Sequence, residues 1–187
     1  MNVYSPRRIR VSLVVKYPTA DFSARRMSSN DYKEVLRTLT IPLVSLGYTA
    51  VHIYRVDELE EAQVGYSVDP SGASLIDDEV GSWQRQWIVI GYEDLCGDPI
   101  IIDIEAEGFP VHTAMHGTGN WAPKLISTGL RNFAAAMNEV AAVAKGRENP
   151  RKLEANPITP DERARVLNGI QRQNPGIDPS FWETWLS

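Results

Sequence analysis

The chain contains little cysteine and no long hydrophobic run. Cys96 is the single cysteine among 187 residues, so no internal disulfide can form, and this fits a reducing compartment. Nowhere do the roughly 18 consecutive apolar residues of a membrane-spanning helix occur. The apolar run at residues 11–15 is broken by Ser12 and followed by Lys16, which makes it too short for a signal peptide. We expect a cytoplasmic protein that does not enter a membrane.

Internal repeats and low-complexity tracts are also absent from the sequence. Hydrophobic residues make up 43% and charged residues 23%, which is the composition of a soluble globular protein. A chain of this length can bury a sizeable core within one domain. A charged stretch that contains several prolines begins after residue 146. We therefore predict one domain over residues 1–146, followed by a linker and a helical tail over residues 147–187 that packs on the domain.

Basic residues are nearly missing from the middle of the chain. Residues 57–107 hold fourteen acidic residues and one basic residue, Arg85, a net charge of −13. Residues 1–56 hold nine basic and three acidic residues, and residues 108–187 hold nine basic and seven acidic ones. The acidic segment is either a solvated surface or a field that speeds the association of a basic protein, and it would repel nucleic-acid phosphates. The candidate partner-binding residues are Asp77, Asp78, Glu79, Glu93, Asp94, Glu105 and Glu107.

Two isoleucine-rich runs predict a β-hairpin. Residues 88–90 and 100–102 are β-branched and apolar, and glycine, aspartate and proline residues stand between them. We expect residues 87–90 and 100–103 to form adjacent antiparallel strands. Strands and helices follow one another in a mixed order, which favours an α+β fold with an antiparallel sheet. Further strands are predicted at residues 9–17, 51–54 and 110–115.

Helices are predicted from apolar spacing and from capping residues. Residues 32–39 carry apolar side chains at i, i+3, i+4 and i+7 after candidate caps at residues 28–31. Residues 130–144 form a long alanine-rich stripe that we expect to lie against the sheet, capped by Ser127 or Thr128. The aromatic end of the tail should pack back on the domain, the alternative being a docking patch for a partner. The aromatic residues of this end are Phe181, Trp182 and Trp185. Two further helices are expected, one at residues 57–61 and one that begins at Thr159 or Pro160.

Two histidines are candidate metal ligands. His112 and His116 stand four residues apart, with Asp98 and Asp103 nearby in the sequence. On a helix both imidazoles would reach one metal ion. Pro110 and the glycines after His116 favour a strand instead, in which four residues span ~13 Å, too far for two ligands of one ion. We therefore predict no metal site and no cofactor, with two partly exposed histidines on a sheet face.

Other reactive residues fit turns better than catalysis. Cys96 could act as a nucleophile beside a histidine, but its hairpin loop offers no helix amino terminus to stabilise a thiolate. Asp98 suits a turn in which its side chain caps local backbone amides, the alternative being a carboxylate pair with Asp103 for acid/base catalysis. The segment at residues 117–119 is glycine-rich but lacks the strand–helix context of a phosphate loop. We predict no catalytic residue.

A family resemblance rests on residues in and around the hairpin, namely Trp87, Gly91, Gly97, Asp98, Pro99, Asp103, Pro110, Val111, His116, Gly117 and Trp121. Further matches are Leu59, Gln63, Gly65 and Tyr66 upstream and the helix around Leu130 and Phe133 downstream. With these residues the chain resembles the SUKH superfamily, which includes fungal regulators of cell-wall assembly and killer-toxin resistance and many bacterial proteins. The resemblance covers about residues 29–145.

The resemblance implies a curved antiparallel sheet flanked by helices and a protein without enzymatic activity, because the shared residues serve as turn and core positions. Many bacterial members are immunity proteins that bind and block polymorphic or contact-dependent toxins, often nucleases, and a toxin of this kind would be the basic partner. The fungal members imply the alternative, a regulatory or scaffold protein with an endogenous partner. A small hydrolase that uses His112, His116 or Cys96 is a third alternative.

Overall fold

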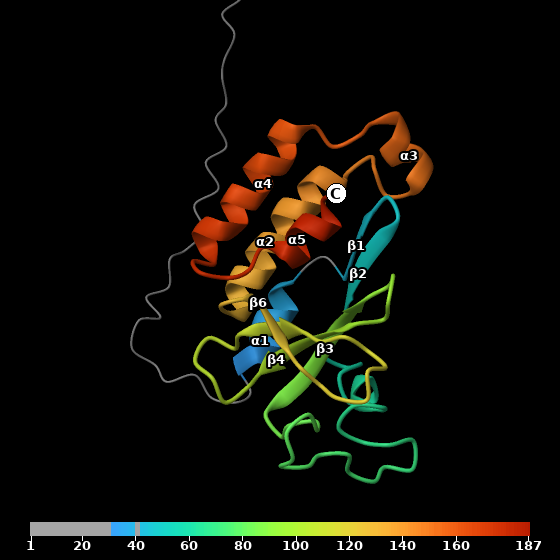
Figure 1. Ribbon diagram of the computed structural model, residues 1–187, viewed down its shortest axis with the longest axis vertical. Coiled ribbons are helices and arrows are strands. Elements are labelled where there is room, and N and C mark those ends of the chain that lie inside the picture. The colour runs from blue at the N-terminus through green and yellow to red at the C-terminus, as the bar shows by residue number, and fades with distance from the viewer. Residues whose placement is uncertain (1–30, 40–41) are drawn as a thin grey trace, which may run out of the picture.

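Six strands form one curved antiparallel sheet, a half-barrel in which neighbours in the chain are neighbours in the sheet (Figure 1). The structure, a computed structural model, describes residues 31–39 and 42–187. The predicted strand at residues 9–17 lies outside the described residues. The strands are β1 (Leu43–Leu46), β2 (Thr49–Ile53), β3 (Trp87–Glu93), β4 (Pro99–Asp103), β5 (Val111–Thr113) and β6 (Lys124–Ser127).

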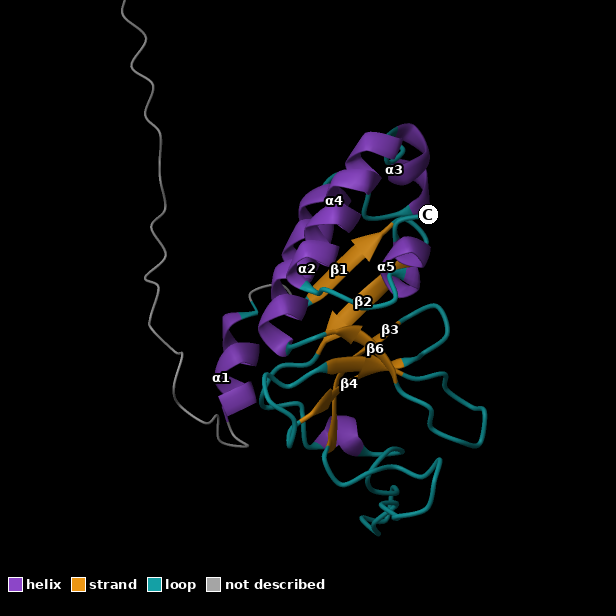
Figure 2. Cartoon of the chain, turned by 60° about the vertical axis from the view of Figure 1, so that its left-hand side comes forward, coloured by secondary structure: helices purple, strands orange, loops and turns teal. Residues whose placement is uncertain are grey.

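Helices cover one face of this sheet, and long connections cover the other (Figure 2). The longest described helix has 15 residues, and none in the described part of the chain has the length and apolar character needed to cross a membrane. The α+β class predicted from the sequence is confirmed. The helices are α1 (Asp31–Thr38), the 3-10 helix η1 (Glu61–Gln63), α2 (Leu130–Ala144), α3 (Pro150–Ala155), α4 (Pro160–Gln173) and α5 (Ser180–Trp185).

The predicted hairpin is strands β3 and β4, which pair antiparallel with Trp87 opposite Asp103 and Ile88 opposite Ile102. Ile88 is partly buried, and the other four isoleucines are buried because both faces of the sheet are covered. Ile90, Ile100 and Ile102 belong to the main core beneath the helices, whereas Ile101 faces a smaller cluster around Trp83. The predicted helix at residues 130–144 is α2, which packs on the main core.

A β-bulge interrupts β3 between Val89 and Gly91. There the side-chain amide of Gln63 makes the two hydrogen bonds that the backbone of a neighbouring strand would make. Its Nε2 donates to the carbonyl of Val89 at 2.9 Å, and its Oε1 accepts from the Val89 amide at 3.0 Å. Nε2 also donates to the carbonyl of Leu59. One glutamine therefore pairs both backbone groups of Val89, which would otherwise be buried and unsatisfied.

The tail is more structured than the linker predicted from composition. Residues 147–160 contain helix α3, and the guanidinium of Arg147 is buried, donating to Val143 O and Asn156 O and to the carboxylate of Glu162. The predicted helix from Thr159 is α4, and its capping box joins Thr159 to Glu162. The predicted packing of the aromatic end is confirmed, since Trp182 and Trp185 are buried.

The tail also covers both edges of the sheet. At β1, the amide of Gly47 donates to the carbonyl of Arg147 and Ser45 Oγ donates to that of Glu148. At β6, the indole N–H of Trp182 donates to the carbonyl of Ile126 at 2.9 Å. Unpaired strand edges invite association with other chains, so this cover protects the sheet.

Two local predictions were wrong, and two strands were not predicted. The amino-terminal cap of α2 is Gly129, because Ser127 belongs to β6 and its hydroxyl donates to Asn174 Oδ1. Residues 57–60 are turns and Glu61 begins η1, so no helix spans residues 57–61. Strands β1 and β6 were missed, because each has four residues and too little alternation to stand out.

Replacing Gly91 with alanine should destabilise the fold by about 3 kcal/mol. A Cβ at this position would lie 2.1 Å from the carbonyl oxygen of His52, so β2 and β3 could not keep their spacing. Urea unfolding should show a lower midpoint at an unchanged slope. Gly117→Ala is the control, since nothing lies near its Cβ and only its positive φ of 79° opposes the substitution. An equal loss in both variants would contradict the close approach.

Stability should depend on Glu162 in acid. Hydrogen bonds from the backbone and side chain of Thr159, and then from Arg147, hold the pKa of Glu162 at about 2, below its ordinary 4.5. A carboxyl with a lowered pKa stabilises the fold above its ordinary pKa, and this contribution is lost as the pH falls towards 2. Glu162→Gln should therefore be less stable than the parent at neutral pH, and the difference should shrink between pH 4.5 and 2 in urea unfolding. A difference that stays constant across this window would contradict the assignment.

Candidate binding groove

A groove of about 410 Å³ opens at one end of the sheet, beside α5. Because adjacent strands are antiparallel, the start of β2, the β3–β4 turn, the end of β5 and the start of β6 all meet at this end. The described residues that line it are Thr49, Ala50, Val51, Glu93, Leu95, Cys96, Asp98, Thr113, Met115, Lys124, Ser180, Phe181, Thr184 and Trp185, and we call it the α5 groove.

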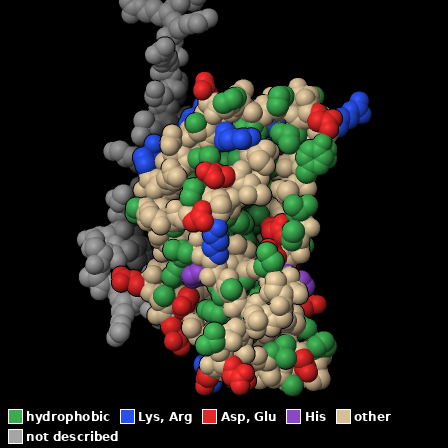
Figure 3. All heavy atoms as spheres, in the orientation of Figure 1, with side chains coloured by type: hydrophobic (Ala, Val, Ile, Leu, Met, Phe, Trp, Pro, Cys, Tyr) green, Lys and Arg blue, Asp and Glu red, His purple; other side chains and the backbone are tan. Residues whose placement is uncertain are grey.

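Large apolar side chains stand exposed at this groove. Leu95, in the β3–β4 turn, is 64% exposed, and Met115, just after β5, is 67% exposed. Phe181 of α5 lies on the groove and is half-buried. The face drawn in Figure 3 shows hydrophobic side chains exposed between acidic and basic ones. Exposed apolar groups of this size around a hollow mark binding surfaces.

The carboxylates at the groove fasten its loops. Glu93 accepts hydrogen bonds from the amides of Leu95, Cys96 and Asp98, which fixes the β3–β4 turn. Asp94 accepts from the amide of Ala50 and so ties this turn to β2. These bonds make the end of the sheet a fixed surface that still carries negative charge.

Asp98 acts across loops, not locally as the sequence suggested. Its Oδ1 accepts from the amide of His116 at 2.7 Å and so joins the β3–β4 turn to the β5–β6 connection. The local cap is found at Asp103, whose Oδ1 accepts from the amides of Glu105 and Ala106. Sequence spacing could not show the first of these bonds, because it depends on the pairing of β4 with β5.

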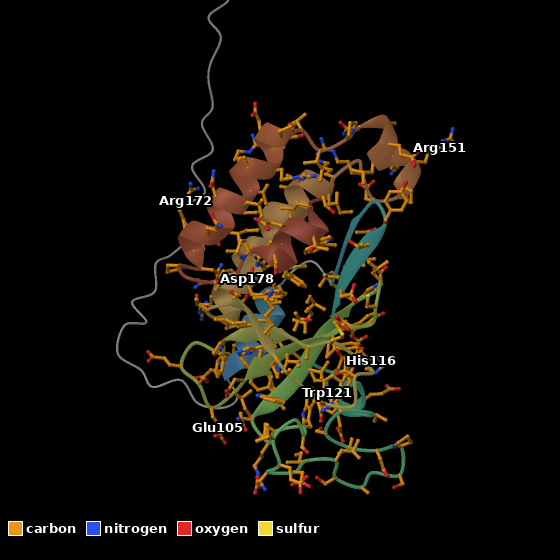
Figure 4. The ribbon with its side chains drawn as sticks, in the orientation of Figure 1. Glu105, His116, Trp121, Arg151, Arg172 and Asp178 are labelled. Carbon is orange, nitrogen blue, oxygen red and sulfur yellow. The ribbon has the colours of Figure 1, made fainter. Side chains whose placement is uncertain are left out.

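The other predicted acidic residues lie away from the groove. Glu105 and Glu107 follow β4, whereas Glu93 and Asp94 precede it, so the five-residue strand separates the pairs by ~17 Å. In Figure 4, Glu105 lies at the left of the sheet, and His116 and Trp121 lie further to the right. The triplet Asp77, Asp78 and Glu79 lies in the long connection between η1 and β3. The predicted partner-binding acids therefore lie in three places, and of these residues only Glu93 lines the groove, with Asp94 next to it in the β3–β4 turn.

The histidines do not face each other. His112 lies on β5, and burial lowers the pKa of its imidazole, while the charge of Asp103 acts in the opposite direction. His116 is exposed beyond β5, with its ring 6.2 Å from that of Trp121 in the cluster that covers the second face of the sheet. Among residues 31–39 and 42–187, no three histidine, cysteine, aspartate or glutamate side chains are grouped to hold a metal ion. Cys96 is exposed in the β3–β4 turn.

Sequence reasoning missed the apolar part of the groove. Leu95 and Met115 each stand alone among polar and turn residues, and a bulky apolar side chain in a turn was the available signal.

Comparison with protein-family models, curated proteins and solved structures finds nothing that matches this chain. What the groove binds must therefore be inferred from its own residues and from the charge around it.

Proposed function

We propose that this chain is a non-enzymatic protein-binding protein, most concretely a bacterial immunity protein that binds and neutralises a cognate polymorphic or contact-dependent toxin. The observation that carries the proposal is the α5 groove, where exposed Leu95 and Met115 stand beside carboxylates already fixed in place. A fixed surface with apolar anchors and polar neighbours is the anatomy of a protein interface.

The chemistry of the groove favours binding over catalysis. General acids and bases must hold or release a proton near a substrate. Here Glu93 and Asp98 accept backbone hydrogen bonds, and Lys124 pairs with Asp178 at 2.6 Å. These charged groups hold the loops and α5 in place. This supports a role in giving the binding surface its shape and charge, and not in proton transfer.

Charge favours a basic partner. The segment 57–107 carries fourteen acids against one base, and toxins that act on nucleic acid are commonly basic. An acidic field raises the association rate of such a partner and disfavours acidic competitors. The bound chain would inhibit the toxin by covering its active site, and this kind of inhibition requires no cofactor.

The resemblance to the SUKH superfamily is a second ground for the proposal. It implies a curved antiparallel sheet flanked by helices, which is the architecture of this chain. It also implies that the shared residues serve turns and the core. Gly91 permits a close strand approach, Gly97 has a φ of +77° in the hairpin turn, and Asp103 caps a turn.

The direct test is protection of a cell from a toxin. A basic nuclease domain encoded beside this gene would be expressed with and without the full chain, and growth and nuclease activity would be measured. Survival together with a stoichiometric complex of the two purified proteins is the expected result. Loss of growth despite high expression of the chain contradicts the proposal, and an endogenous protein bound by the groove instead would favour the regulatory alternative.

Charge reversal should slow association with the toxin. Glu105→Lys with Glu107→Lys, and Asp78→Lys with Glu79→Lys, change exposed side chains that make no hydrogen bond or ion pair within the described residues. Whichever pair faces the toxin should lower the association rate about tenfold at low salt. The effect should fade as the Debye length falls from ~30 Å at 0.01 M to ~8 Å at physiological ionic strength. Stopped-flow mixing would measure it.

The control for this experiment is Glu139→Lys with Asp161→Lys, on helices α2 and α4, which changes the net charge equally outside the acidic segment. Glu93 and Asp94 are left intact, because their reversal would release the loops of the groove. Equal rates for all three double variants at low salt would show that the acidic segment is solvated surface.

A further inference from the structure

Unpaired polar atoms gather around the α5 groove. Six buried side-chain nitrogen or oxygen atoms in the described residues have no hydrogen-bond partner, and three of them belong to residues that line this groove. They are Thr49 Oγ1, Thr113 Oγ1 and the indole Nε1 of Trp185, a residue that is 7% exposed. Buried polar atoms are nearly always paired in folded proteins, so three such atoms at one site call for an explanation.

The strands account for their convergence. Thr49 begins β2 and Thr113 ends β5, so both lie at the groove end of the sheet. Side chains two residues apart share a face, and Val51 and Val111 belong to the main core. Both hydroxyls therefore face the helical side of the sheet, where Trp185 of α5 lies.

Side-chain hydrogen bonds and an ion pair hold the first turn of helix α5 to the sheet, whereas its last turn has none to the described strands. Lys124 pairs with Asp178 and donates to Ser180 Oγ, each at 2.6 Å, and the indole of Trp182 donates to Ile126. Trp185, one turn later, is buried to a similar degree but its N–H donates to nothing. The last turn is held to the sheet by the burial of Trp185 and Leu186 in the main core, and a shift of this turn breaks no side-chain hydrogen bond to the sheet.

We propose that the α5 groove takes an extended segment of the partner protein, with one apolar side chain between Leu95, Met115 and Phe181 and with its backbone carbonyls on the unpaired groups. The proposal rests on the proposed function, since it names the part of the partner that is bound. The indole N–H of Trp185 only donates, so the ligand must supply an acceptor for it, and the two threonine hydroxyls can donate to further acceptors. The segment reaches these shielded atoms when the last turn of α5 shifts.

The charge around the groove selects among acceptors. Glu93 and Asp98 line the groove and disfavour a carboxylate or phosphate, and the lining Lys124 is already paired with Asp178. A neutral peptide carbonyl carries no such penalty. The same carboxylates favour lysine or arginine on either side of the apolar residue. A volume of about 410 Å³ accommodates a large side chain and the adjoining backbone.

Selection from a display library of short random peptides tests this inference on the purified full chain. The matched control is the variant Leu95→Asp with Met115→Asp, which changes two side chains that are 64% and 67% exposed and should fold normally. Enriched peptides should share one apolar residue next to lysine or arginine. They should bind the variant at least about tenfold more weakly, the loss expected for one large buried side chain. Equal binding to both proteins, or no enrichment, overturns the inference.

The indole N–H signals report whether Trp185 becomes paired. In a ¹⁵N–¹H spectrum, a selected peptide should shift the signal of Trp185 and leave that of Trp182, which already donates to Ile126. Trp185→Phe keeps an aromatic ring without the N–H and should weaken peptide binding about fivefold, the loss of one hydrogen bond. An unmoved Trp185 signal, or full affinity in Trp185→Phe, overturns the assignment of this group.

Failure of this inference can be told apart from failure of the proposed function. If Leu95→Asp with Met115→Asp still neutralises the toxin fully, the immunity function stands and the groove is not its binding site. If selected peptides bind as expected while no toxin is neutralised, the groove is a peptide site and the immunity function falls.

Discussion

The approach of β2 to β3 is the constraint on which the sheet depends. At Gly91 the two backbones lie so close that a single added carbon would meet the carbonyl of His52. The bulge beside it turns the backbone of Val89 towards Gln63, and the backbone amide of Tyr54 donates a hydrogen bond to the carbonyl of Ile90. These contacts set the position of β2, and β2 in turn carries β1 and the segment that contains Arg147. A small displacement here would therefore be passed to the tail.

The groove is a consequence of the same topology. In a sheet that runs in chain order, every second connection lies at the same end, so turns far apart in the sequence become neighbours. The bond between Asp98 and the amide of His116 and the bond between Asp94 and Ala50 then join these turns. Helix α5 closes the remaining side. Rigid elements hold the loops that carry function, as in many binding proteins.

The elements with strong local patterns could be predicted from the sequence, and the long-range contacts could not. The isoleucine runs predict β3 and β4, the alanine-rich stripe predicts α2, and Thr159 with Glu162 predicts the start of α4. Strands β1 and β6 have four residues each and depend on pairing partners for their stability. For the site, the acidic character of residues 57–107 led to the prediction of Glu93 and Asp94 as partner-binding residues. The meeting of Leu95, Met115 and Trp185 at one groove becomes visible only when four separate segments are brought together.

The tail that covers both edges of the sheet is made after the sheet itself. A ribosome releases all six strands before residues 147–187 emerge, so β1 and β6 stay open for the time needed to add the tail. Open edges can pair with the edges of other nascent chains. Chains whose synthesis stops early would meet the same hazard permanently. The order of synthesis thus makes the addition of residues 147–187 the step that closes both edges of the sheet.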